Sequence, residues 1–213
     1  MSSPTETKPR WERRKDARPQ ELLAAALEQF VERGYAATRL EDVARRAGVS
    51  KGTLYLYFEN KEELFKAVVR DSIVLPIGEA EHTISGYDGD SGALLRVILM
   101  SWWDQIGATK LAGISKLMMA ESGNFPDLAR FYNEEVIARG NGLITRVLER
   151  GMDSGEFRRL DTALMTPILT APVLMLEMWT HSQVSCAMSQ IAPAAYMDAY
   201  IDFAVRGLAA AAA

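Results

Sequence analysis

The sequence predicts an all-α protein with a small N-terminal domain and a larger C-terminal one. Apolar residues recur with a helical period along almost the whole chain, whereas the alternation typical of strands is scarce. Glycines and prolines separate these periodic segments into about nine helices. Charge is unevenly divided: residues 1–66 carry 13 basic and 11 acidic side chains, and residues 67–213 carry 11 and 17. A basic start on an acidic body indicates two parts with different tasks.

Composition limits the cellular setting. Apolar residues make up 48% of the 213 residues, enough for a sizeable core. The single cysteine, Cys186, excludes an intrachain disulfide and fits a reducing compartment. The polar N-terminus does not resemble a signal peptide, and no run of 18 apolar residues is present, so we expect a cytoplasmic protein without a membrane span.

The first helix is expected over residues 17–33. Pro19 suits its first turn and Gly34 suits the position after its end. One apolar face is formed at helical spacing by Leu22, Leu23, Ala26, Leu27, Phe30 and Val31.

A short second helix follows, with Thr38 as the expected N-cap and Glu41 three residues later, the spacing of a capping box. Gly48 should end it, because glycine takes a positive φ without steric cost. Its inward residues are expected to be Leu40, Val43, Ala44 and Ala47.

Ser50 can cap a third helix that begins at Lys51, and Asn60 can cap a fourth that runs from Lys61 to about Leu75. Pro76 and Gly78 should end or kink this fourth helix. Further helices are expected near residues 91–106, 109–121, 126–150, 161–185 and 193–210, with Pro126 at the start of the third and Pro167 and Pro172 bending the fourth.

Two short helices joined by the four residues 47–50 form a helix-turn-helix arrangement. Leu54 and Phe58 share the face that must be buried, so the opposite face of the third helix points outward. That face holds Gly52, Thr53, Tyr55 and Leu56, with Tyr57 at the flank. Small, hydroxyl and aromatic side chains suit a DNA groove. An outward Leu56 can pack on a thymine methyl; the alternative is a leucine tucked against the fourth helix.

The stretch TRLEDVARRAGVSKGTLYLYFENKEELF resembles the DNA-binding signature of the tetracycline-repressor (TetR) family, over about residues 22–65. The resemblance implies an all-helical fold with three DNA-binding helices and a larger dimeric domain. It implies phosphate contacts from Thr38, Lys51, Tyr57 and Lys61. It implies base contacts from Gly52, Thr53 and Tyr55. We also include Ser50 among the candidate DNA-binding residues. We therefore expect a DNA-binding domain over 17–66 and an effector-binding and dimerisation domain over 67–213.

Residues 1–16 are expected to form a basic, disordered arm. Arg14 and Arg18, close to the first helix, can enter an adjacent minor groove, as basic arms of other DNA-binding domains do. The alternative is a tail that attracts DNA weakly and without sequence preference.

Methionine and tryptophan are frequent in residues 91–203, and both adapt well to apolar ligands. Candidate effector contacts are Trp103, Met119, Phe125, Tyr132, Met175 and Trp179, with Arg130 or Glu177 as one polar contact. Each residue can equally be ordinary core. A pocket so lined would prefer an apolar or aromatic molecule.

The last two long helices carry apolar residues on more than one side. In the TetR family these helices pair with their mates in a dimer; the alternative is burial within one chain. The residues are Leu164, Ile168, Leu169, Leu174, Met178, Tyr196, Tyr200, Phe203 and Leu208.

We therefore expect a homodimeric, ligand-responsive transcriptional repressor that binds a pseudo-palindromic operator, needs no cofactor and is released by an apolar effector. An activator or a ligand-independent regulator of the same fold is the closest alternative. Glu177 and His181 are spaced to share a metal, but two ligands do not make a site, and no catalytic set is recognisable. A metal sensor or an enzyme is therefore the more distant hypothesis.

Overall fold

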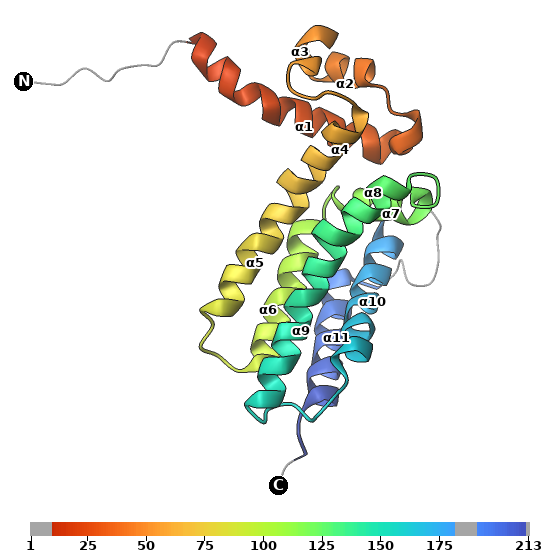
Figure 1. Ribbon diagram of the computed structural model, residues 1–213. Helices are drawn as coiled ribbons and strands as arrows, with labels where there is room; N and C mark the ends of the chain where they lie inside the picture. Colours follow the sequence, from red (N-terminus) through yellow and green to blue (C-terminus); the bar gives the residue numbers. More distant parts are fainter. Residues whose placement is uncertain (1–9, 182–190, 212–213) are drawn as a thin grey trace, which may run out of the picture. The chain divides into compact units, whose positions relative to one another are not determined.

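The computed structural model describes residues 10–181 and 191–211, and confirms the all-α class for that part of the chain. Within these ranges the only extended pairing is an isolated bridge between Phe157 and Ala209. The chain divides into two compact units, residues 1–68 and 69–213. The first unit is formed by α1 (Arg10–Ala37), α2 (Leu40–Arg46), α3 (Lys51–Tyr55) and the start of α4 (Lys61–Val69) (Figure 1).

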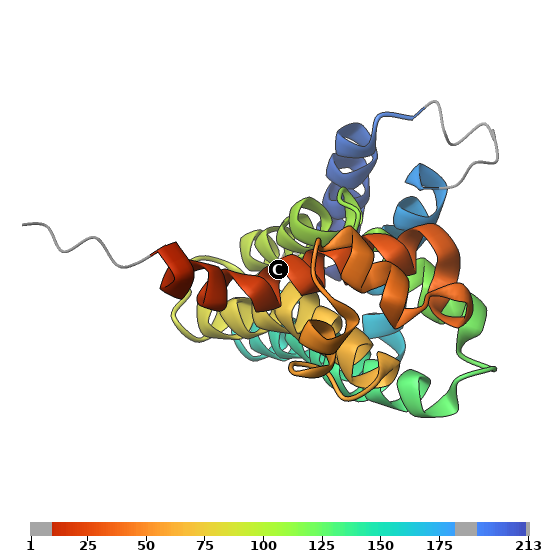
Figure 2. The ribbon, with the colours of Figure 1, turned by 90° about the horizontal axis from the view of Figure 1, so that it is seen from above.

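In the first unit, α1 packs against α2, and α2 packs against α3 (Figures 1 and 2). Three aromatic rings fill the core between α1 and α4. Phe30 lies 5.1 Å from Phe65 in an edge-to-face pair, and Tyr35 lies 5.5 Å from Phe65 in another, measured between ring centroids. Leu54 of α3 and Val43 of α2 are fully buried as expected. These contacts hold two helices that are too short to be stable alone.

Two boundaries differ from the expectation at the start of this unit. Helix α1 begins at Arg10 rather than near residue 17, so residues 10–16 are helical and Pro19 lies inside the helix. A proline at this interior position removes one backbone hydrogen bond of the helix, because it has no N–H to donate to the carbonyl four residues earlier. At Gly34 the backbone leaves helical geometry with φ 80°, which confirms the break expected there, and one more turn follows to Ala37.

The prediction that Thr38 caps the second helix in a capping box is wrong. Helix α2 has Arg39 at its N-cap, with no side-chain cap, and Thr38 is buried one residue earlier. The Thr38 hydroxyl instead lies 2.7 Å from the Gly34 carbonyl oxygen and 3.0 Å from that of Gln29. It therefore satisfies carbonyls at the end of α1 rather than an N–H of α2.

The other two caps are confirmed. The Ser50 hydroxyl accepts the Thr53 N–H at 3.1 Å, and the Asn60 side-chain oxygen accepts the Glu63 N–H at 2.9 Å.

The second unit contains longer helices, three of them with a π-helical turn. Pro76 was expected to end or kink the fourth helix, and it does not end the helical path. Instead α4 gives way to the π-helical turn Arg70–Val74, whose longer hydrogen-bonding period accommodates the missing N–H of Pro76, and helix continues to Ser85. The elements are η1 (Arg70–Val74), α5 (Leu75–Ser85), α6 (Ser91–Trp102), η2 (Trp103–Gly107), α7 (Ala112–Glu121), α8 (Pro126–Tyr132), η3 (Asn133–Ile137), α9 (Ala138–Asp153), α10 (Thr162–Thr180) and α11 (Pro193–Leu208).

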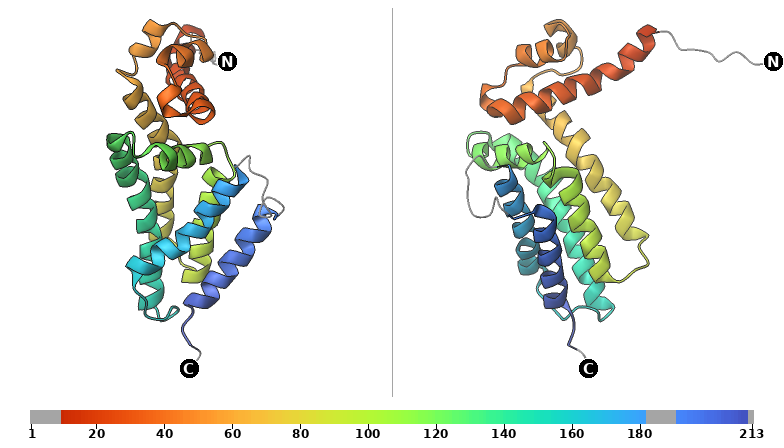
Figure 3. Two further views of the ribbon diagram at one scale, coloured as in Figure 1. Left: turned by 90° about the vertical axis from the view of Figure 1, so that its right-hand side faces the viewer. Right: turned by 180° about the vertical axis from the view of Figure 1, so that it is seen from behind.

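Helix α9 is central to this unit, because it packs against α5, α6 and α10. Helix α11 packs against α6 and α10, and Figure 3 shows α10 and α11 side by side at the edge of the bundle. By length and mean hydropathy α10 could cross a membrane, and 28% of its apolar window is buried among the described residues. A single such helix is weak evidence for a membrane span, because packed helices of water-soluble proteins pass the same test.

Gly48 and Gly52 give a matched pair for testing the turn. Gly48 has φ +67°, whereas Gly52 lies in α3, where an added Cβ would meet Ser50 Oγ as its nearest neighbour at 3.8 Å. We expect Gly48→Ala to lower the free energy of unfolding by about 1–2 kcal/mol, and Gly52→Ala to leave it unchanged or raise it by up to about 1 kcal/mol. Urea denaturation followed by circular dichroism measures both; equal stability of the two variants would contradict the assignment of strain to Gly48.

Candidate functional site

The turn between α2 and α3 has the geometry of a helix-turn-helix. Gly48 takes a positive φ of 67° directly after Ala47, the C-cap of α2, and Ser50 is the N-cap of α3. The N–H of Val49 returns to the Ala44 carbonyl at 3.0 Å, which closes the turn. Leu54 is fully buried, so it fixes which face of α3 points to solvent.

The outward face of α3 matches the sequence expectation residue by residue. Gly52 is exposed and Thr53 is partly exposed. Tyr55 is 44% exposed and Leu56 is 84% exposed, so Leu56 is not tucked against the fourth helix. Tyr57 is also exposed at 37%. Exposed aromatic and aliphatic side chains on α3 and the two residues that follow it form a surface that can contact base edges and thymine methyls.

Lys51 lies at the start of this surface in an ion pair. Its ammonium is 2.5 Å from a Glu41 carboxylate oxygen, and both side chains are about half exposed. The pairing raises the pKa of Lys51, and the hydrogen bond from Lys51 lowers the pKa of Glu41. Exposed ion pairs contribute little to stability, so a phosphate can replace Glu41 as the partner of Lys51 at small cost.

The structure gives Lys61 and Thr38 internal partners. The Lys61 ammonium donates to the carbonyl oxygens of Tyr35, Ala36 and Thr38, at 2.7, 3.1 and 3.1 Å. It also lies 4.5 Å from the centroid of the Tyr35 ring. A cation at this position satisfies carbonyls at the end of α1. A phosphate contact from Lys61 would need one of these bonds to be given up, and the Thr38 hydroxyl is buried against two other carbonyls.

The remaining predicted DNA contacts lie at the start of α1. Arg14 and Arg18 belong to the helix that begins at Arg10, but their side chains lie outside what the structure describes. Their entry into a minor groove stays a prediction.

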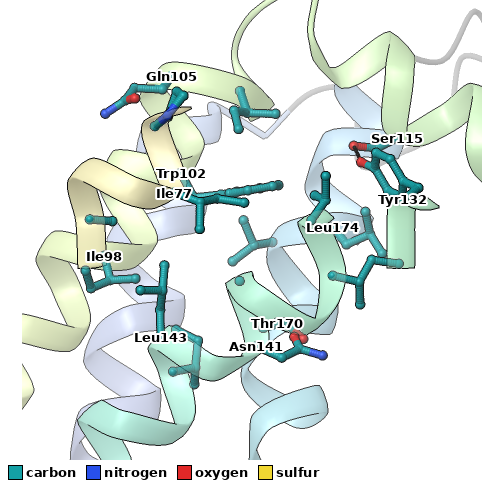
Figure 4. A pocket seen from close by; sticks show the side chains of 18 of the residues that line it. Ile77, Ile98, Trp102, Gln105, Ser115, Tyr132, Asn141, Leu143, Thr170 and Leu174 are labelled. Atoms are coloured by element: carbon teal, nitrogen blue, oxygen red, sulfur yellow. Dashed lines mark hydrogen bonds between the residues drawn. The ribbon is translucent and has the colours of Figure 1, made fainter. Parts of the chain in front are cut away.

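A cavity of about 390 Å³ lies within the second unit (Figure 4). Its walls come from α5 to α10 and are mainly aliphatic, as in Ile77, Ile98, Leu143 and Leu174. No acidic or basic side chain lines it among the described residues. This size and lining are typical of sites for small apolar molecules.

Two of the six candidate effector contacts line this cavity, Met119 and Tyr132. Trp103 does not: it is buried, and its ring packs on Gly107, where an added Cβ would come within 2.6 Å. The neighbouring Trp102 lines the cavity instead. Adjacent helical residues point about 100° apart, so the sequence could not decide which tryptophan faces inward.

The other three candidates have different surroundings. Trp179 makes an edge-to-face contact with Tyr196 of α11, at 6.3 Å between ring centroids. Met175 is exposed on α10, and Phe125 precedes α8 without lining the cavity. Arg130, a possible polar contact, is exposed and pairs with Asp127 at 3.3 Å.

Polar groups gather at one end of the cavity. The hydroxyls of Ser115 and Tyr132, both lining residues, lie 3.2 Å apart (Figure 4). Glu177 is completely buried nearby, and neither of its carboxylate oxygens has a hydrogen-bond partner among the described residues. Burial raises the pKa of Glu177 to about 6, and weak hydrogen bonding from Ser115 and Trp102, outside the ordinary range of distance and angle, partly opposes this. Sequence reasoning named Glu177 but missed Ser115, because a serine on an apolar helix gives no signal of its own.

Glu177 and His181 do not form part of a metal cluster in the described residues, which contain no group of three suitable ligands. The His181 ring nitrogen Nε2 lies 2.8 Å from the Gly107 carbonyl oxygen, which occupies it with a protein partner. Cys186 lies outside the described residues.

This combination of an exposed helix-turn-helix surface and a separate helical unit with an apolar cavity defines a DNA-binding regulator. Residues 22–68 match the family described as "Bacterial regulatory proteins, tetR family". Residues 93–211 match the "AefR-like transcriptional repressor, C-terminal domain". The chain therefore belongs to the TetR family of transcriptional regulators and is not an enzyme.

Individual relatives agree with this assignment. The "Fatty acid metabolism regulator protein" of Bacillus subtilis is 30% identical over 154 residues, which cover 70% of this chain and 77% of that protein. The "HTH-type transcriptional activator FasR" of Mycolicibacterium smegmatis is 39% identical over 95 residues; the match covers 43% of this chain and only 42% of that protein.

Solved structures share the fold. The transcriptional regulator FadR from Bacillus subtilis, in complex with stearoyl-CoA, superimposes with a TM-score of 0.75 at 22% identity. The match covers 89% of this chain and 98% of that chain.

The buried Glu177 should make stability depend on pH. Its folded pKa of about 6 lies above the ordinary value of 4.5, so the protein loses stability as pH rises from 4.5 through 6. The loss should be about 2 kcal/mol by pH 7.5. We expect Glu177→Gln to remove this loss, measured as unfolding free energy against pH. Glu149→Gln, an exposed change on α9, is the control; equal pH profiles for wild type and Glu177→Gln would contradict the prediction.

Proposed function

We propose that the protein is a homodimeric, ligand-responsive repressor that binds a pseudo-palindromic operator in the cytoplasm and is released by a small, largely apolar effector. The observation that carries the proposal is the outward face of α3, where Tyr55, Leu56 and Tyr57 are exposed next to Lys51. Leaving such side chains in water is unfavourable, whereas a DNA groove gives them partners. On this account Gly52, Thr53 and Tyr55 contact bases, and Lys51 and Tyr57 contact phosphates.

The cavity supports an apolar effector. Its walls are mainly aliphatic, and its volume of about 390 Å³ lies in the range of small-molecule sites. The names of relatives that mention fatty acid metabolism or stearoyl-CoA favour a fatty-acyl derivative as the class of effector.

The faces of α10 and α11 support a dimer. Leu164 and Ile168 of α10 and Phe203 of α11 are 65%, 59% and 77% exposed. Ile168 and Phe203 line an apolar groove between the two helices, whose walls also include Tyr196, Tyr200 and Leu208. A two-fold dimer would bury this surface and present two recognition helices to half-sites about one DNA turn apart.

For effector binding to control DNA binding, the effector must bind one of two conformations of the protein more tightly than the other, by about 1–3 kcal/mol. Pro76 and Ile77 of the cavity wall follow α4 in sequence through the π-helical turn Arg70–Val74. Helix α5 is also tied to α9 by the Glu81–Arg139 ion pair, with 2.9 Å between Arg139 Nη2 and the carboxylate. A ligand that moves α5 can therefore act on the segment that leads to the DNA-binding unit.

An activator of the same fold is the second candidate. It is favoured by the name of the FasR relative, a transcriptional activator. The sign of control depends on where the operator lies relative to the promoter, and both candidates use the same contacts.

Tyr55→Ala tests the recognition surface. Removing the exposed ring should abolish specific operator binding, because a base contact is lost without any change to the core. Fluorescence anisotropy with labelled DNA from upstream of the gene measures the affinity, and wild-type binding should weaken with salt at a log–log slope of about −5. Tyr55→Phe, which keeps the ring, is the matched control. Unchanged affinity of Tyr55→Ala would disprove the assignment of the surface.

Phe203→Glu tests the dimer. A charge on the exposed face of α11 should shift the protein to a monomer in sedimentation-velocity experiments, because it would be buried at the interface. Leu75→Glu, an equally drastic change at an exposed leucine of α5, should leave the assembly unaltered. A Phe203→Glu protein that remains dimeric would rule out this face as the interface.

A further inference from the structure

The apolar cavity has one polar end, and its position is well defined. The Ser115–Tyr132 hydroxyl pair lies on one side of the cavity, whereas Gln105, Asn141 and Thr170, three of the other polar lining residues, lie away from it (Figure 4). Tyr132 is buried and burial raises its pKa to about 12, so this hydroxyl stays neutral and protonated at physiological pH.

Glu177 is close enough to this pair to interact with both residues. Its charge adds to the rise in the pKa of Tyr132, and hydrogen bonding from Ser115 and Trp102 lowers its own pKa, so Glu177 interacts with each of these three side chains. The Glu177 side chain has no exposed surface, and both carboxylate oxygens lack a hydrogen-bond partner in the described part of the chain. Burying a carboxylate is costly, and the Ser115 hydroxyl and the Trp102 indole N–H are donors close enough to offset part of that cost.

The carboxylate determines how the hydroxyls point. A negative charge behind Ser115 and Tyr132 attracts their hydrogens and leaves oxygen lone pairs toward the cavity. No lysine, arginine or histidine lines the cavity among the described residues. A ligand therefore meets hydrogen-bond acceptors and a negative field at this end, and no cation that could pair with an acid group.

We infer that the effector places a hydrogen-bond donor, such as a hydroxyl, amide N–H or ammonium group, against Ser115 and Tyr132, and that Glu177 excludes ligands with a carboxylate at this position. This inference deepens the proposed function and rests on it. A fatty-acyl effector would then enter as a derivative without a free acid, because a free fatty acid would bring a second carboxylate next to Glu177.

Three ligands with the same ten-carbon chain test the inference: 1-decanol, decylammonium and decanoate. Titration calorimetry of the full-length protein at pH 7.5 should give decylammonium at least about tenfold tighter than decanoate, with decanol between them. Glu177→Gln should bring the three affinities within about threefold of one another, because it keeps the shape and removes the charge. Ser115→Ala should weaken the binding of decanol specifically, because it removes one of the two paired hydroxyls and keeps the charge of Glu177.

Thr170→Val is the matched control, since it removes a lining hydroxyl from a different part of the cavity and should keep the wild-type order. Decanoate binding as tight as decanol in the wild type, or an order unchanged in Glu177→Gln, would overturn the inference and leave the apolar effector in place. Absence of binding by all three ligands would instead contradict the apolar effector itself, and the inference with it.

Discussion

The DNA-binding unit depends on the packing of two very short helices against α1. Helices α2 and α3 have seven and five residues, too few for stability in isolation. The edge-to-face contacts of Phe30, Tyr35 and Phe65 form the core, and Lys61 joins the start of α4 to three carbonyls at the end of α1. The outward face of α3 can remain exposed because these contacts hold the buried side of the helix in place.

The second unit differs from the first, because its helices enclose a cavity. Its helices are long, and three of them contain a π-helical turn, at Arg70–Val74, Trp103–Gly107 and Asn133–Ile137. Such turns disturb the regular helical packing and often occur at functional sites. The space left between helices is apolar, and the buried Glu177 costs stability there. A site that is unfavourable when empty can gain free energy when a complementary ligand fills it.

Much of this fold was predictable from periodicity and from glycine and proline. Gly48, Ser50 and Asn60 have the roles that their chemistry indicates. Thr38 was misassigned because a threonine before a helix can bond backward to the preceding helix as well as forward, and the sequence does not distinguish the two. For Pro76 the sequence left open whether the helix ends or bends, and the structure shows a π-helical turn there with helix on both sides.

The candidate sites were predictable to different degrees. The recognition surface follows from one buried residue, Leu54, and the helical period, so local sequence was enough. The cavity forms where six helices pack together, so the sequence alone could not distinguish lining residues such as Trp102 and Ser115 from their neighbours. Trp103, Phe125, Met175 and Trp179 are of suitable chemical type, yet none of them lines the cavity.

The most direct test of the account is whether filling the cavity releases DNA. Labelled operator DNA bound to the protein would be titrated with ten-carbon ligands while anisotropy and ligand binding are followed together. The account predicts that anisotropy falls in step with occupancy of the cavity and that the best-bound ligand releases DNA at the lowest concentration. Saturation of the cavity with no change in anisotropy would contradict the claim that this cavity controls DNA binding.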